Sequence, residues 1–447
     1  MSGYALRTAG RLGLMAFFRR IEVAGRENLP SAGPLLLVPN HTNAFIDALA
    51  VAAVVPRRVI LTAKSTLFGH PVLRTLLHAV GAIALHRRQD RDQGADPAAN
   101  LESLAECRRR LSRGEAVCIF PEGVSHSDAH LRPLRTGAAR IAFDFLEHEK
   151  GTITVVPVGL HYEAKERFRS SVWVRFGAPI DAAAWRAARP EAGVRELTAE
   201  IEKSLRALTV NFRRRREAAL LQWTAEVLAT RGLPPALLGR DEGAVADRAI
   251  LAALLSEGYE KLEASHHETI ARLEERVRRY HADLRRLGIS PPEVYLEMDA
   301  GRAALFVVRE VETLLIGLPL AFLGTLLHGP AYGIARAVVF RVSVDRDHWA
   351  TNAIFIGSAL VLLFSALELA AAWIFLSWPF ALALTALLPY SGYYALLYRD
   401  RAGGVLRRSR TFLRFLFDRG LQHRLAEEGR SIIAAIERLA EAAPART

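Results

Sequence analysis

Residues 35–47 read LLLVPNHTNAFID, a stretch that predicts a strand, a polar loop and the start of a helix. The apolar run from Leu35 to Val38 is typical of a strand in the centre of a parallel sheet, and Ala44 to Val54 reads as a helix. Asn40 and His41 are therefore expected on the loop at the carboxyl end of a strand.

The same alternation continues along the chain. From about residue 33 to 180, short β-rich apolar runs alternate with helical stretches, which indicates an α/β domain with a mostly parallel sheet flanked by helices. Ligands bind at the carboxyl ends of the strands in open α/β sheets, so polar residues that follow different strands are expected to share one cleft. The predicted strands cover 35–38, 58–62, 81–86, 115–120, 153–158 and 172–176, and the predicted helices cover 44–54, 66–79, 98–111 and 137–147.

Composition limits the classes of protein to consider. With 447 residues, of which 51% are apolar, the chain can fill two or three domains and is not disordered. The net charge of +12 favours an anionic partner such as a phospholipid surface, a nucleic acid or a phosphorylated substrate. Arg213 to Arg216 is not accompanied by an aromatic platform, so no nucleic acid is expected. Cys107 and Cys118 form no Cys-x-x-Cys pair, so no zinc or redox centre is expected.

His41 and Asp47 are the candidate catalytic pair. Six helical positions would place the two side chains about 240° apart, so His41 must lie before the helix, with its ring over the first turn toward Asp47. A carboxylate that holds one ring nitrogen leaves the other to take a proton from an alcohol at neutral pH. We predict that His41 is a general base and that Asp47 orients it. The alternative is an ordinary capping or surface histidine.

A second polar loop follows the buried strand that ends near Phe120. Proline stops the pairing of the sheet there and glycine permits close approach of a ligand, so Glu122 is expected at the cleft. The loop-to-helix step at 136–140 has free N–H groups and nearby arginines that suit a phosphate, although a Pro-Gly turn with solvated arginines is the alternative. The predicted substrate-binding residues are Asn40, Arg87, Pro121, Glu122, Gly123, Ser125, His126 and Arg135, and no metal ligand is predicted.

Four blocks in this order resemble the glycerolipid acyltransferases over about residues 20 to 180. They are Asn40-His41 through Asp47, Gly81 through Arg87, Phe120-Pro-Glu-Gly123 and Val156 through Leu160. The resemblance implies transfer of a fatty acyl group from acyl-CoA or acyl-carrier protein to a glycerophosphate hydroxyl in phospholipid biosynthesis. It also implies that Arg87 binds the phosphate. The acyl donor is a substrate, and no separate cofactor is expected.

Two departures from the commonest pattern affect the expected acceptor. Five residues separate His41 from Asp47, where lysophosphatidate acyltransferases usually have four, and Val124-Ser125-His126 replaces their Thr-Arg. Both features look more like the branch that acylates glycerol-3-phosphate or dihydroxyacetone phosphate. Arg135 or Arg132 is left to supply the missing charge. The alternatives are a 1-acylglycerol-3-phosphate (lysophospholipid) acyltransferase and an inactive scaffold with the acyltransferase fold.

The C-terminal part predicts membrane helices. Ala353 to Tyr398 contains one charge, Glu368, and as a helix it would span about 69 Å against about 30 Å for one crossing, so it predicts a hairpin that turns near Ser377. Pro319 and Pro330 interrupt the apolar run at 314–340, which favours a re-entrant or interfacial pair. Arginines on both flanks of the hairpin predict that both flanks, and the catalytic domain, face the cytoplasm, at the inner membrane if the protein is bacterial.

These predictions combine into one domain organisation. The expected partners are membrane lipid, the acyl donor and the glycerophosphate acceptor, and no oligomeric state is predicted. Residues 1–20 are expected to form an interfacial amphipathic helix, with a helix packed on its own domain as the alternative. The other parts are a catalytic domain at 21–182, a helical arm or insert at 183–300, a membrane region at 301–400 with its hairpin at 353–398, and basic amphipathic helices at 401–447.

Overall fold

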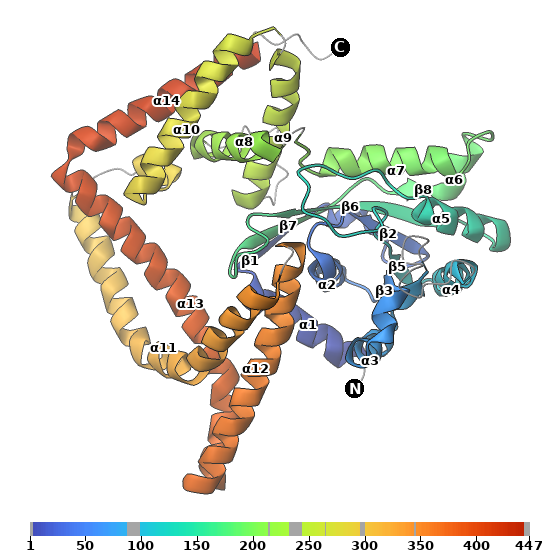
Figure 1. The fold of residues 1–447 in the computed structure, drawn as a ribbon, viewed down its shortest axis with the longest axis horizontal. Coiled ribbons are helices and arrows are strands. Elements are labelled where there is room, and N and C mark those ends of the chain that lie inside the picture. Colours follow the sequence, from blue (N-terminus) through green and yellow to red (C-terminus); the bar gives the residue numbers. More distant parts are fainter. Residues whose placement is uncertain are drawn as a thin grey trace. The chain divides into compact units, whose positions relative to one another are not determined.

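The computed structural model describes residues 3–86, 99–212, 215–231, 244–263, 265–295, 300–343 and 346–441. The chain divides into two compact units. The first comprises Met1–Arg213 with the segments Pro235–Ala246 and Val344–Thr351, and the second comprises Arg214–Pro234, Asp247–Ser343 and Asn352–Thr447. The first unit contains the sheet, and the described elements of the second unit are helices (Figure 1).

An eight-stranded sheet forms the centre of the first unit, in the order β1-β7-β6-β2-β5-β3-β4, with β8 paired to β6. Along this order every pair is parallel except β6 with β7, and β8 is also antiparallel to β6, so the predicted mostly parallel sheet is confirmed. The strands are β1 Arg20–Ala24, β2 Leu35–Pro39, β3 Val59–Lys64, β4 Ile83–Leu85, β5 Ala116–Cys118, β6 Thr154–Tyr162, β7 Ser171–Phe176 and β8 Ile180–Asp181.

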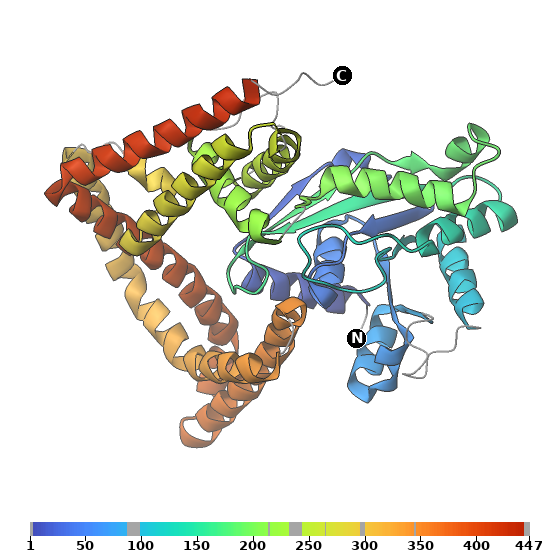
Figure 2. The same ribbon diagram turned by 45° about the horizontal axis from the view of Figure 1, so that its top comes forward.

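Helices cover both faces of this sheet. Alternate residues of the central strands, such as Leu36 and Val117, point into one apolar core with α4 (Asn100–Ser112), α5 (Gly137–His148), α6 (Ala182–Ala187) and α7 (Val194–Leu208). Figures 1 and 2 show α1 (Gly3–Phe17) and α2 (Ala44–Val54) on the other side. Trp185 and Leu197 are buried in the same core, so the first unit extends past the predicted boundary at residue 182.

The predicted helix at 66–79 is divided. It consists of a 3-10 turn, η2 (Ser65–Gly69), followed by α3 (Pro71–Val80). His70 between them has an extended backbone with φ −86° and ψ 124°. The residue before a proline is disfavoured in the helical region, so Pro71 starts a new helix rather than continuing the first one.

The N-terminal helix α1 packs on its own unit at one end. Leu14 and Phe17 are buried, as is Phe18 directly after the helix, whereas Leu12 and Met15 are 62% and 51% exposed. The alternative prediction, a helix that packs on its own domain, therefore applies to the C-terminal end of α1. Two large apolar side chains remain available for the predicted interfacial contact, which stays a prediction.

The second unit has its own apolar core. Leu220, Val277, Phe415 and Ile432 are among its buried residues. Part of the apolar face of α14 packs into this core, and the predicted membrane-surface contact of residues 401–447 stays a prediction. The helices of this unit are α8 Arg215–Leu228, α9 Ala244–Glu263, α10 His267–Leu287, α11 Ala300–Val342, α12 Arg346–Phe375, α13 Trp378–Phe417 and α14 Arg419–Glu441, with the first residues of α9 and α12 belonging to the first unit.

Within the described ranges, three helices are long and apolar enough to cross a membrane: Val308–Val342, Trp349–Phe375 and Trp378–Phe417. The last two meet at Leu376 and Ser377, where the sequence predicts the turn of the hairpin. The predicted interruption at 314–340 is not observed, because α11 continues through Pro319 and Pro330, and the re-entrant or interfacial placement of this segment stays a prediction.

α11 packs closely against α13. A Cβ atom on Gly324 would overlap the carbonyl oxygen of Ser391, so the two backbones approach each other directly. The hydroxyl of Tyr398 donates to the carbonyl of Leu314 at 3.0 Å.

Candidate active site

His41 lies on the loop between β2 and α2, as predicted. Its Nδ1 is 2.9 Å from Oδ2 of Asp47, which lies in the first turn of α2. The side chain of Asp47 is fully buried, and that of His41 is 17% exposed. The ring of His41 stacks on Phe120, with centroids 4.0 Å apart. The predicted geometry, in which the carboxylate holds one ring nitrogen from over the first turn, is confirmed, while the catalytic role stays a prediction.

Asp47 accepts three hydrogen bonds. Oδ2 faces Nδ1 of His41 and accepts the Asn43 N–H at 2.7 Å, and Oδ1 accepts the Tyr162 hydroxyl at 2.6 Å. Burial, and then the neighbouring Asp47, raise the pKa of Tyr162 well above its usual value, so the phenol stays neutral and donates. Because Asp47 offers an acceptor to Nδ1, that nitrogen carries the proton, and Nε2 of His41 keeps the lone pair that a base needs.

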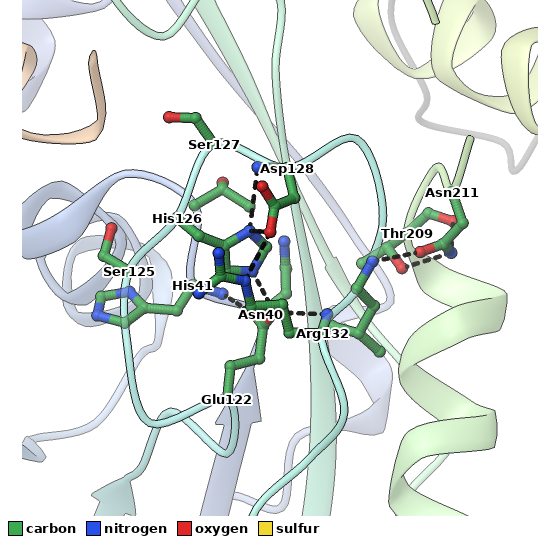
Figure 3. A network of polar contacts seen from close by, with 12 residues as sticks. Asn40, His41, Glu122, Ser125, His126, Ser127, Asp128, Arg132, Thr209 and Asn211 are labelled. Atoms are coloured by element: carbon green, nitrogen blue, oxygen red, sulfur yellow. Dashed lines mark hydrogen bonds and ion pairs between the residues drawn. The ribbon is translucent and has the colours of Figure 1, made fainter. Parts of the chain in front are cut away.

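Glu122 lies buried beneath the two loops and is held by protein donors (Figure 3). Its Oε1 accepts the backbone N–H of His41 at 2.6 Å. Its Oε2 accepts the backbone N–H of Arg132 at 3.0 Å and pairs with Nε2 of His126. The glutamate therefore fixes the position of the His41 backbone. His126 is itself buried and helps to hold that carboxylate.

The loop after β5 is joined to the His41 loop by further bonds. The hydroxyl of Ser125 accepts the N–H of Ala44 at 2.9 Å, and the N–H of His126 donates to the carbonyl of His41 at 3.2 Å. Ala44 has a φ of +43°, an uncommon conformation for a residue with a Cβ. The bond from Ser125 therefore supports a strained residue at the start of α2.

The remaining predicted residues have different surroundings. Asn40 binds the backbone of Leu160 in both directions, at 3.1 Å and 2.7 Å, so it ties the end of β2 to β6. The carbonyl of Pro121 accepts the N–H of Arg135 at 2.7 Å, and the side chain of Arg135 is exposed. Gly123 has a φ of +75°, which favours glycine at this turn. Arg87 lies outside the described residues.

Two residues of the site are not among the predicted catalytic and substrate-binding residues. Tyr162, at the end of β6, reaches Asp47, and Nζ of Lys165 donates to the carbonyl of Thr42 and to the hydroxyl of Ser127, both at 2.8 Å. Tyr162 and Asp47 are 115 positions apart, so no local pattern could predict their contact. Among the described residues, no group of three or more His, Cys, Asp and Glu side chains could hold a metal ion.

Comparison with known proteins agrees with the site. Residues 20–161 match the family model named Acyltransferase. An uncharacterized acyltransferase of Schizosaccharomyces pombe is 28% identical over 180 residues, which is 39% of this chain and 25% of that protein. The chloroplastic 1-acyl-sn-glycerol-3-phosphate acyltransferase LPAT1 of Arabidopsis thaliana is 28% identical over 144 residues, 32% of this chain and 36% of that protein.

A third relative has a different acceptor in its name. Glycerol-3-phosphate O-acyltransferase 1 of Saccharomyces cerevisiae is 36% identical over 107 residues, 22% of this chain and 14% of that protein. The chain thus spans between 14% and 36% of the length of these three relatives. The family match at residues 20–161 includes His41, Asp47 and Glu122. Residues 20–161 therefore match an acyltransferase family, and two of the relatives similar to this chain are named as glycerolipid acyltransferases.

Proposed function

We propose that the protein is a membrane-bound enzyme that transfers a fatty acyl group from a thioester donor, acyl-CoA or acyl-carrier protein, to a hydroxyl of glycerol-3-phosphate or dihydroxyacetone phosphate. The observation that carries this proposal is the contact of 2.9 Å between Nδ1 of His41 and Oδ2 of Asp47. It leaves Nε2 of a partly exposed imidazole as a base at the carboxyl edge of the sheet.

The reaction needs one displacement at the thioester carbonyl. Nε2 of His41 takes the proton of the acceptor hydroxyl as its oxygen bonds to the carbonyl carbon. Asp47 stabilises the imidazolium that forms. When the tetrahedral intermediate collapses, the carbon–sulfur bond breaks and the thiolate leaves, taking the proton back from His41. The products are an ester and a free thiol.

Neither cysteine is suited to act as a nucleophile in this reaction. Cys107 and Cys118 are both fully buried. Burial raises the pKa of the Cys107 thiol to about 12 and also raises that of Cys118. A thiol that stays protonated is a poor nucleophile, so direct transfer without an acyl-enzyme intermediate is the simpler route.

Cationic groups near the same edge support a phosphorylated acceptor. Arg135 has an exposed side chain two positions before α5, which begins at Gly137, and a helix N-terminus favours an anion. Lys64 ends β3, which pairs with β5 in parallel, so it lies toward the same edge. The role proposed for Arg87 rests on the family resemblance.

A lysophospholipid acceptor is the second candidate. One relative is named for 1-acyl-sn-glycerol-3-phosphate and another for glycerol-3-phosphate, so the comparisons favour both acceptors. The interval of five residues between His41 and Asp47 and the Val124-Ser125-His126 string favour glycerol-3-phosphate or dihydroxyacetone phosphate.

An acceptor and donor panel tests the proposal. The full chain in lipid nanodiscs is assayed with glycerol-3-phosphate, dihydroxyacetone phosphate and lysophosphatidate, each with acyl-CoA and with acyl-carrier protein. The highest kcat/KM is expected for one of the first two acceptors. A clear preference for lysophosphatidate would establish the second candidate. An absence of transfer to all three acceptors would favour the inactive scaffold.

We also propose a location for the domain. The three apolar helices support a membrane protein. The arginine-rich flanks of the hairpin support a cytoplasmic position for the catalytic domain, at the inner membrane if the protein is bacterial. Soluble acyl donors and phosphorylated acceptors are found on that side.

A further inference from the structure

The tyrosine at the end of β6 has one polar contact that bears on the candidate base. The hydroxyl of Tyr162 donates to Oδ1 of Asp47 at 2.6 Å, and within the described residues it is the only donor to that oxygen. The aromatic ring of Tyr162 packs near Phe18, with centroids 5.7 Å apart. The ring thus belongs to an apolar contact, while the hydroxyl is directed at the carboxylate.

The packing alone does not require a phenol. A phenylalanine would make the same contact with Phe18, so the hydroxyl has a separate role. Asp47 is fully buried, and without Tyr162 its Oδ1 would have no donor among the described residues. A buried acceptor without a partner is unfavourable, so the carboxylate would turn to share the donors on Oδ2. That rotation would weaken the bond that holds Nδ1 of His41.

We propose that Tyr162 is a positioning residue, whose hydroxyl holds the Asp47 carboxylate in the orientation that presents Oδ2 to His41. The proposal rests on the function proposed above for His41. It assigns Tyr162 no contact with the substrate. Its effect is carried entirely through Asp47 and should appear in the proton transfer step rather than in binding.

Other titratable groups surround the pair. Glu122, after β5, accepts the backbone N–H of His41, and His126 pairs with Glu122. Lys165, after β6, binds the carbonyl of Thr42, and the buried Cys118 lies near enough to Asp47 for the carboxylate to raise the pKa of its thiol further. None of the three hydrogen bonds of Glu122, His126 and Lys165 involves Oδ1 of Asp47, so the Tyr162→Phe substitution removes the hydrogen bond to that oxygen and leaves these three in place.

The test is the Tyr162→Phe variant of the full chain in nanodiscs, assayed with the acceptor and donor on which the wild type is most active. We expect kcat to fall about 10- to 100-fold, with both KM values within about twofold of wild type. The acidic limb of the kcat/KM profile should move to lower pH. A carboxylate that has turned away from Nδ1 stabilises the imidazolium less, so the imidazole of His41 stays neutral over a wider range of pH.

A matched control separates this effect from the loss of any tyrosine hydrogen bond. Tyr259 on α9 donates to Oε1 of Glu274 at 2.8 Å in the second unit. Tyr259→Phe removes the same type of bond and should leave kcat and the pH profile unchanged. In a double-mutant cycle, Tyr162→Phe should cost little when Asp47 is already Asn, because its effect passes through that carboxylate.

The possible outcomes are distinct. If the wild type transfers no acyl group, the proposed function fails before Tyr162 is tested. If the wild type is active and Tyr162→Phe keeps its kcat and its acidic limb, the positioning role is wrong. A loss confined to KM, or an additive loss in the Asp47→Asn background, would also overturn it.

Discussion

The buried carboxylate of Asp47 joins the loop before α2 to the end of β6. Its oxygens hold the imidazole of His41, the backbone of Asn43 and the hydroxyl of Tyr162. Glu122 has a similar role, because its carboxylate accepts the backbone N–H of His41. The candidate base is thus fixed through both its ring and its main chain, which is the preorganisation that proton transfer needs.

Replacing the base should remove turnover without unfolding the chain. We expect His41→Ala to lower kcat by about 10²- to 10⁴-fold, the usual contribution of a general base. The melting transition should remain cooperative, because Asp47 keeps its bonds to Asn43 and Tyr162. The comparison is His423→Ala, which changes a histidine with a 69% exposed side chain on α14. Full activity in purified His41→Ala would contradict the mechanism.

At the scale of elements, local patterns predicted the central structure well. The helix from Ala44 to Val54 has the predicted bounds, and the sheet is largely parallel as the alternation indicated. The sequence pattern did not predict elements whose formation depends on a partner far away in the chain. β1 is an edge strand that contains Arg20 and Glu22 and pairs with β7, about 150 residues away in the chain. No hydrophobic run marks such a strand.

In the candidate site, too, the local sequence predicts some features, while partners far away in the chain determine others. The position of His41 relative to Asp47 follows from helix geometry alone, so it was predictable from six residues of sequence. The bonds that Asn40 makes to Leu160 depend on which strands are neighbours, so the sequence could suggest only that Asn40 lies near the cleft. Similarly, α11 continues through two prolines where the local pattern predicted an interruption, and its packing against α13 is not visible in that pattern.

The packing of α11 on α13 can be tested at two glycines of α11. Gly324→Ala places a Cβ against the carbonyl of Ser391, so we expect a destabilisation of about 1–3 kcal/mol. Gly333→Ala meets no atom within 4 Å and should leave the stability unchanged or slightly raised. Thermal unfolding in detergent, followed by intrinsic fluorescence, measures both. Equal effects of the two substitutions would show that the close approach is not needed.

At the scale of the whole molecule, the second unit combines a helical core with the apolar helices. Within it, Nε of Arg276 on α10 lies 3.0 Å from Oε1 of Glu428 on α14, and Nη2 of the same arginine donates to Ser431 at 2.9 Å. On α11 and α13, Glu310 and Arg401 form a further ion pair at 2.9 Å. Helices from before and after the apolar segments are thus in direct contact.

This contact predicts the result of a labelling experiment. Single cysteines at Ala282→Cys on α10 and Arg438→Cys on α14, both at exposed positions, should react with a membrane-impermeant maleimide from the same side of sealed vesicles. Leu376→Cys, at the turn between α12 and α13, should react from the other side. The background is low because Cys107 and Cys118 are buried. Labelling of α10 and α14 from opposite sides would contradict the contact between them.

The contact between α10 and α14 also constrains how the chain crosses a bilayer, through simple parity. Two segments that touch in the same aqueous layer must be joined by an even number of complete crossings. Three helices between them are long and apolar enough to cross, and three is odd. At least one of the three is therefore not a complete crossing, although length and hydropathy alone would have counted it as a full span.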